Sequence, residues 1–166
     1  MKTLRNVAIG TLLVASFVPV IAFAQTPTTS QACLTAATQA SQASVASART
    51  ARDSALSAAM TARDTALTAA KTTLTSAKTA AMTARDTALT AAKALTDKTA
   101  SATAVKAARA DYATAVKTAN TTYTAAVKSA RSDYTAAAKT ARDTYTAAVK
   151  TATATAKTAR AACPTK

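Results

Sequence analysis

The eleven residues TARDTALTAAK occupy positions 61–71, and the same eleven letters return unchanged at positions 83–93. Eleven residues make three turns at about 3.67 residues per turn, which is close to the period of a relaxed α-helix. Alanine, leucine, lysine and arginine favour helices, and no proline lies between Pro27 and Pro164. The repeat therefore predicts an all-α fold that is helical along almost all of this interval.

The repeat changes phase near the middle of the chain. Arg63 and Lys71 mark it in the first half, whereas Lys128 and Arg131 mark it in the second, displaced by two positions in the eleven-residue frame. At about 98° per residue, this displacement turns the pattern through about half a revolution. Residues 96–103 are rich in Thr, Ser and Asp, which favour turns and helix caps. The shift favours two antiparallel helices, and one unbroken helix is the alternative.

Residues 1–24 have the features of an export signal. Lys2 and Arg5 give a positive start, residues 7–20 are mostly apolar, and Ala-Phe-Ala at 22–24 fits a cleavage site. A retained N-terminal anchor is the alternative, although the apolar run is short for a membrane span. We expect a protein that is secreted or periplasmic and has no integral membrane span once the signal is removed.

The two cysteines support the hairpin, because the midpoint between Cys33 and Cys163 is Lys98, inside the phase shift. Export also makes a disulfide the default expectation for them. We therefore expect a long antiparallel two-helix hairpin, an alanine-rich eleven-residue (hendecad) coiled coil closed by this disulfide. An intermolecular disulfide and the dimerisation of two hairpins into a four-helix bundle stay open. The expected layout is a flexible N-terminal segment at 25–32, a hairpin at 33–163 with helix 34–96, turn 97–100 and helix 101–162, and a tail at 164–166.

The composition excludes most catalytic chemistry. The 166 residues include no His, no Glu and one Gly, with 21 Lys and Arg against 7 Asp and a net charge of +14. The commonest general bases and metal ligands are therefore missing. A single glycine also rules out a glycine-rich phosphate loop. We expect no enzymatic activity, no cofactor and no metal site.

Four tyrosines recur in the second half at steps of eleven, at Tyr112, Tyr123, Tyr134 and Tyr145. A fold about Lys98 places each ring opposite a small residue of the first helix, which favours close packing in the seam between the helices. A ladder of rings that stacks on bases or sugars is the alternative.

Threonines with spacings of four, seven and eleven lie in a row on a face predicted to be free of arginine and lysine. They could simply fill positions where alanine is not required. However, alanine-rich helices with threonine repeated every eleven residues resemble the type I antifreeze proteins of fish, including their long, hairpin-forming relatives. The resemblance implies ice binding through a flat Thr/Ala face. The implied ice-binding residues are Thr61, Thr65, Thr68, Thr72, Thr79, Thr83, Thr87, Thr90, Thr140, Thr144, Thr151 and Thr155.

Cationic residues are predicted to line the opposite broad face of the hairpin. A strongly positive rod attracts anionic polymers through a salt-dependent charge interaction. The alternative to ice as a partner is therefore an anionic envelope polymer, such as lipopolysaccharide, teichoic acid or nucleic acid, bound by a cationic structural coiled coil. The predicted basic face comprises Arg52, Arg63, Lys71, Arg85, Lys93, Arg109, Lys117, Lys128, Arg131, Lys139 and Arg142.

Overall fold

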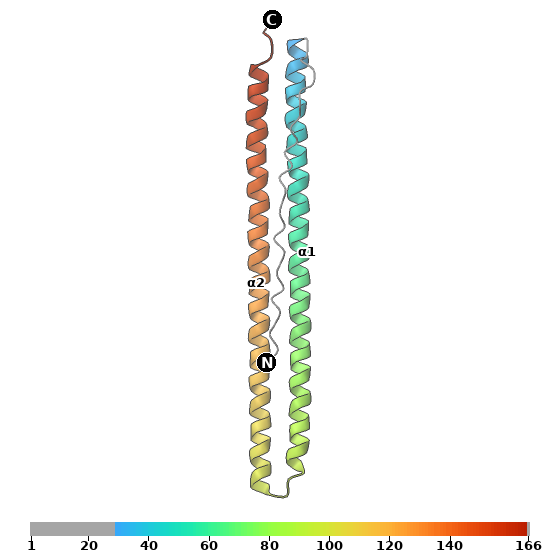
Figure 1. Ribbon diagram of the computed structural model, residues 1–166, viewed down its shortest axis with the longest axis vertical. Coiled ribbons are helices and arrows are strands. Elements are labelled where there is room, and N and C mark those ends of the chain that lie inside the picture. The colour runs from blue at the N-terminus through green and yellow to red at the C-terminus, as the bar shows by residue number, and fades with distance from the viewer. Residues whose placement is uncertain (1–28, 166) are drawn as a thin grey trace. The chain divides into compact units, whose positions relative to one another are not determined.

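The computed structural model describes residues 29–165, which form two long helices. Helix α1 spans Ser30–Lys93 and helix α2 spans Lys98–Ala161. They are antiparallel and pack as a hairpin around the turn at residues 94–97 (Figure 1). The prediction of an all-α two-helix hairpin is confirmed. The predicted export signal lies outside the described residues.

Helix α1 begins at Ser30, earlier than the sequence suggested. The Oγ1 atom of Thr29 accepts a hydrogen bond from the backbone N–H of Ala32 at 3.2 Å. A threonine that accepts from the first turn is an N-cap, and this cap satisfies a backbone donor that the helix itself leaves unpaired. The last residues of the segment expected to be flexible are consequently helical.

Helix α1 also ends earlier than residue 96, where the sequence analysis placed its end. Beyond Lys93, the N–H of Ala94 bonds to the carbonyl of Ala91 at 3.2 Å, and the N–H of Leu95 bonds to that of Ala92 at 3.3 Å. These tighter bonds, each spanning three residues, commonly close the last turn of an α-helix. They stop the helix before the polar stretch begins.

Asp97 is the last residue of the turn and caps helix α2, which therefore begins at Lys98 and not at residue 101 as predicted. Its Oδ1 atom accepts from the N–H of Thr99 at 2.7 Å and from that of Ala100 at 3.4 Å. Aspartate is among the preferred N-cap residues, so helix begins directly after it. No residue in 29–165 has a positive φ angle, so this turn forms without glycine.

The two helices pass through two compact units. One unit is Ser47–Ala148, and the other, among the described residues, combines 29–46 with 149–165. In the first unit, buried alanines recur every eleven residues on both helices and form the seam between them. Small side chains in a seam let two helix axes approach closely. The buried rows in this unit are Ala70, Ala81 and Ala92 on α1, and Ala108, Ala119, Ala130 and Ala141 on α2.

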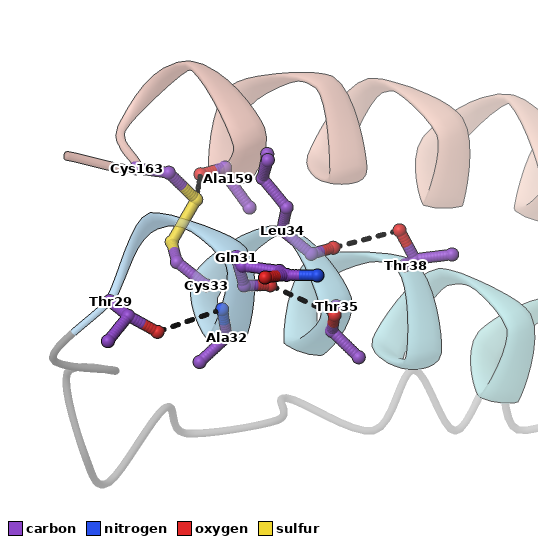
Figure 2. The surroundings of a disulfide bond; sticks show 9 residues. All are labelled: Thr29, Gln31, Ala32, Cys33, Leu34, Thr35, Thr38, Ala159 and Cys163. Atoms are coloured by element: carbon purple, nitrogen blue, oxygen red, sulfur yellow. Dashed lines mark hydrogen bonds between the residues drawn. A yellow bond between two sulfur atoms is a disulfide. The ribbon is translucent and has the colours of Figure 1, made fainter. Parts of the chain in front are cut away.

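The second unit contains the predicted disulfide. Cys33 and Cys163 are bonded within the chain, with their Cα atoms 5.7 Å apart (Figure 2). Nearby, the Nη2 atom of Arg160 donates to the Oγ1 atom of Thr38 at 3.1 Å, which links the two helices again. The start of α1 is thereby joined to the end of α2. Between residues 29 and 165, neither helix holds a stretch that is apolar enough to cross a membrane.

Candidate functional site

Three tyrosines of α2 pack against arginines of α1, and not against the small residues that the sequence analysis placed opposite them. Each guanidinium carbon lies over a ring at a distance that is typical of a cation–π interaction. Such a contact is worth about 0.5–1 kcal/mol at an exposed site and about 2 kcal/mol when it is desolvated. The three rungs are Arg52 over Tyr145 at 4.7 Å, Arg63 over Tyr134 at 4.8 Å and Arg85 over Tyr112 at 4.7 Å from the ring centroid.

Each of these arginines is also paired with the aspartate that follows it. The guanidinium nitrogens approach the carboxylates of Asp53, Asp64 and Asp86 at 2.7–2.8 Å. The arginine side chains are only 27–30% exposed. Consequently Arg52, Arg63 and Arg85, which were predicted for the open basic face, lie at the edge of the seam with their charges balanced.

The rungs hold one antiparallel register along the unit Ser47–Ala148. From the first rung to the second, the arginine moves eleven residues forward on α1 and the tyrosine moves eleven residues backward on α2. From the second rung to the third, both move by twenty-two residues. This register puts Leu74 opposite Tyr123, and both side chains are half-buried. Arginines cover the other three rings, which argues against an open stacking ladder for bases or sugars.

The threonines of α1 lie on the side of the helix that faces away from α2. Thr72 comes two residues after the buried Ala70, and Thr83 comes two residues after the buried Ala81. Two residues correspond to about 196° around the helix, so the threonines are opposite the seam. They therefore lie on the outer side of α1. The sequence analysis had placed them on a broad face of the hairpin, and this placement is wrong.

This row is longer than the threonines alone indicate. Serines occupy the same phases, so every third or fourth residue over this part of α1 carries a hydroxyl, and all twelve residues are exposed. We call this set the hydroxyl row. It lies wholly in the unit Ser47–Ala148 and consists of Thr50, Ser54, Ser57, Thr61, Thr65, Thr68, Thr72, Ser76, Thr79, Thr83, Thr87 and Thr90. Four members, Thr50, Ser54, Ser57 and Ser76, were not predicted, although their positions in the eleven-residue repeat match those of the predicted threonines.

One flank of the hydroxyl row is lined by small exposed residues. At about 98° per residue, the neighbouring phases contain alanine and one threonine but no charged side chain. Together with the hydroxyl row they form a continuous surface of Ala, Ser and Thr, which we call the small-residue surface of α1. Its flanking members are Ala51, Ala58, Ala62, Ala69, Thr73, Ala80, Ala84 and Ala91.

Most hydroxyls in this surface are not used by the helix. Among the eight α1 threonines predicted to bind ice, only Thr90 donates to the backbone, to the carbonyl of Asp86 at 2.9 Å. All eight side chains are exposed. The hydroxyls of the other seven are therefore available to water.

The threonines predicted on α2 do not extend this surface into one plane. Thr140 is adjacent to the buried Ala141, so it lies about a quarter turn from the seam. Asp133 interrupts the side on which Thr144 lies. Thr151 and Thr155 are exposed but belong to the other unit, after Ala148.

The exposed cations are concentrated on α2. That helix carries eleven Lys and Arg against three Asp, whereas α1 carries seven against three and uses three of its arginines in the rungs. Of the predicted basic face, the exposed members are Lys71 and Lys93 on α1 and Arg109, Lys117, Lys128, Arg131, Lys139 and Arg142 on α2. The exposed cations thus lie chiefly on α2 and the uninterrupted hydroxyl row lies on α1, so the two sets do not occupy the two broad faces of the hairpin.

The described chain, residues 29–165, holds no group of three His, Cys, Asp or Glu that could bind a metal ion. No protein-family model, no curated protein and no solved structure matches this chain.

Proposed function

We propose that this protein is exported, acts without catalysis and binds ice through the small-residue surface of α1. The observation that supports the proposal is the hydroxyl row, in which twelve consecutive outward positions are Ser or Thr and all are exposed. A random solvated face of a protein with 28 charged residues would carry charges at some of these positions. This surface carries none.

The geometry suits a flat, periodic ligand. Because eleven residues complete three whole turns, equivalent side chains stay in line and do not spiral around the helix. They recur about every 16 Å along the axis, at 1.5 Å per residue. Threonine has one strongly restricted side-chain torsion, so the row is stiff, and each residue presents a methyl group beside a hydroxyl. An extended lattice of ordered water molecules is a ligand that matches a straight, uncharged and rigid array.

The rungs support this role by fixing α1 against α2. Each rung combines a stacked arginine, a tyrosine ring and an aspartate, and the three rungs hold one register. Their exposed aspartates border the hydroxyl row on its other flank without interrupting it. A surface that is rigid before binding loses less conformational entropy when it binds.

The test is ice shaping by the purified, oxidised protein. We expect it to shape ice crystals and to lower their growth temperature, and we expect Thr68→Lys or Thr79→Lys to abolish both effects. Either change places a long, strongly hydrated cation in the middle of the hydroxyl row.

The matched control is Thr135→Lys, which adds the same charge at an exposed position of α2. It should leave ice shaping unchanged. If the oxidised wild-type protein does not alter ice growth, or if Thr135→Lys is as damaging as Thr68→Lys, the proposal is wrong.

A further inference from the structure

We propose that α2 carries a binding site for a linear phosphate polymer, separate from the ice-binding surface proposed for α1. The site is a row of cations in the unit Ser47–Ala148, which we call the cation stripe. It consists of Lys106, Arg109, Lys117, Lys128, Arg131, Lys139 and Arg142.

The stripe is regular because its members keep a constant relation to the seam. Arg109, Arg131 and Arg142 each come one residue after a buried alanine, and the lysines each come two residues before one. At about 98° per residue, the arginines lie about a quarter turn from the seam and the lysines lie opposite it. Lysine and arginine three residues apart are neighbours on a helix surface. The stripe therefore repeats a Lys–Arg pair about every 16 Å, with Asn120 in place of one arginine.

The charges of the stripe are largely uncompensated. Lys139 pairs with Asp143, whereas no ion pair is formed by the other six cations within the described chain. Asp111 and Asp133 come two residues after an arginine, which places them on the other side of α2. On α1 the carboxylates of Asp53, Asp64 and Asp86 are held by arginines. A ligand that approaches the stripe meets almost only positive charge.

The dimensions of the stripe favour a polymer over a small anion. From Lys106 to Arg142 it extends over about 54 Å at 1.5 Å per residue. No single small molecule can contact both ends. A chain with closely spaced negative charges can engage all seven cations at once and release its counterions, which is a large part of the affinity for polyanions.

Two features of the chain favour a phosphate polymer over a membrane or a single-stranded nucleic acid. The large exposed apolar side chains between residues 29 and 165 are Leu34, Met60, Met82 and Leu95, none of which lies on α2, so nothing beside the stripe would enter a lipid layer. Single-stranded nucleic acids are usually held by stacking on open aromatic rings. Three of the α2 tyrosines are covered by arginines. The cation stripe is therefore expected to recognise its ligand through charge, without lipid insertion or base stacking.

The experiment measures the affinity of the full oxidised protein for inorganic polyphosphate chains longer than the stripe, over a series of salt concentrations. We expect binding at about 0.05 M salt that weakens steeply towards about 0.2 M. The variant Lys117→Gln/Lys128→Gln/Arg131→Gln should lose at least about tenfold in affinity at the lower salt. The slope of log K against log salt should fall by about two to three, because about one contact is lost per residue.

The control variant is Arg49→Gln/Lys71→Gln/Lys93→Gln. It also removes one arginine and two lysines, but from exposed positions of α1. We expect it to lose less than about threefold. Circular dichroism checks that both variants remain helical, and ice shaping by the α2 variant should equal that of the wild type, because the two surfaces are independent.

Equal losses in the two variants would show attraction by net charge and would overturn the site on α2. Tighter binding of single-stranded oligothymidylate than of polyphosphate with the same number of phosphates would show that bases are recognised, and this would overturn the ligand class. Failure of ice shaping with intact polyphosphate binding would reject only the function proposed for α1.

Discussion

At the scale of single residues, the arginine of the repeat has a different role in each half of the chain. Arg63 reaches across the seam to the ring of Tyr134 and holds the carboxylate of Asp64, whereas Arg131 is exposed and forms no ion pair. The difference comes from phase. Arg63 lies four residues after the half-buried Ala59, so it stays on the seam side, but Arg131 is adjacent to the buried Ala130 and points a quarter turn away.

A double-mutant cycle measures one rung. We expect Arg63→Gln and Tyr134→Leu, separately and together, to give a coupling free energy of about 0.5–2 kcal/mol in urea unfolding followed by circular dichroism. The same cycle for Arg131 and Tyr134, three residues apart on α2, should give a coupling near zero, because this arginine is not stacked on a ring. A comparable coupling free energy in both cycles would mean that the stacking of Arg63 on Tyr134 contributes no specific stability.

At the scale of the elements, two long helices form from a repeat of unusually uniform composition, and their ends are set by a few polar side chains. Thr29 caps α1 and Asp97 caps α2. The change of phase predicted that the chain would turn near residue 98, but it could not place the turn to the residue. The turn-favouring side chains in 96–103 include Asp97, and a strong N-cap nucleates the next helix immediately.

Removal of the cap of α2 tests this account. We expect Asp97→Ala to lower the free energy of unfolding by about 1 kcal/mol, within a range of about 0.5–2 kcal/mol for such caps. Asp97→Asn should retain most of the stability because its side-chain oxygen can still accept from Thr99. Asp111→Ala, at an exposed position inside α2, is the control for loss of a carboxylate. If Asp111→Ala is equally destabilising, loss of charge explains the effect and capping does not.

At the scale of the whole molecule, the seam is thin and the disulfide compensates for it. Alanine buries little apolar area, so each buried alanine contributes little to the free energy of folding. The Cys33–Cys163 bond closes a loop with a sequence separation of 130. In the chain-entropy model, a loop of this size stabilises the folded state by about 4–5 kcal/mol.

Reduction of this disulfide should therefore have a large and localised effect. In Cys33→Ser/Cys163→Ser, we expect the free energy of unfolding to fall by about 4–5 kcal/mol in urea titrations. Hydrogen exchange should accelerate most at residues 30–46 and 149–161, because all three rungs lie within Ser47–Ala148. The single variants Cys33→Ser and Cys163→Ser serve as controls, and each should match the double variant. Uniform acceleration along both helices would contradict the expectation that the disulfide stabilises its own unit most and the rungs stabilise Ser47–Ala148.

The sequence by itself determined that the chain is helical and placed the phase shift to within a few residues of the turn. These features depend on the eleven-residue period of the repeat and on its change of phase, and both can be read directly from the sequence. The sequence favoured antiparallel packing and a Cys33–Cys163 bond, and the structure excluded the unbroken helix and showed that the bond lies within one chain. Only the tertiary structure decided which side chains of the repeat face inward. Arg52, Arg63 and Arg85 have long, flexible side chains that can reach either solvent or a neighbouring ring. Which of the two they reach depends on a tyrosine of the other helix. For Arg52 and Arg63 this tyrosine is about seventy or more residues away along the chain. Because the buried alanines face α2, the hydroxyl row occupies the outside of α1; because those arginines lie at the edge of the seam, the exposed positive charge is left mainly to α2.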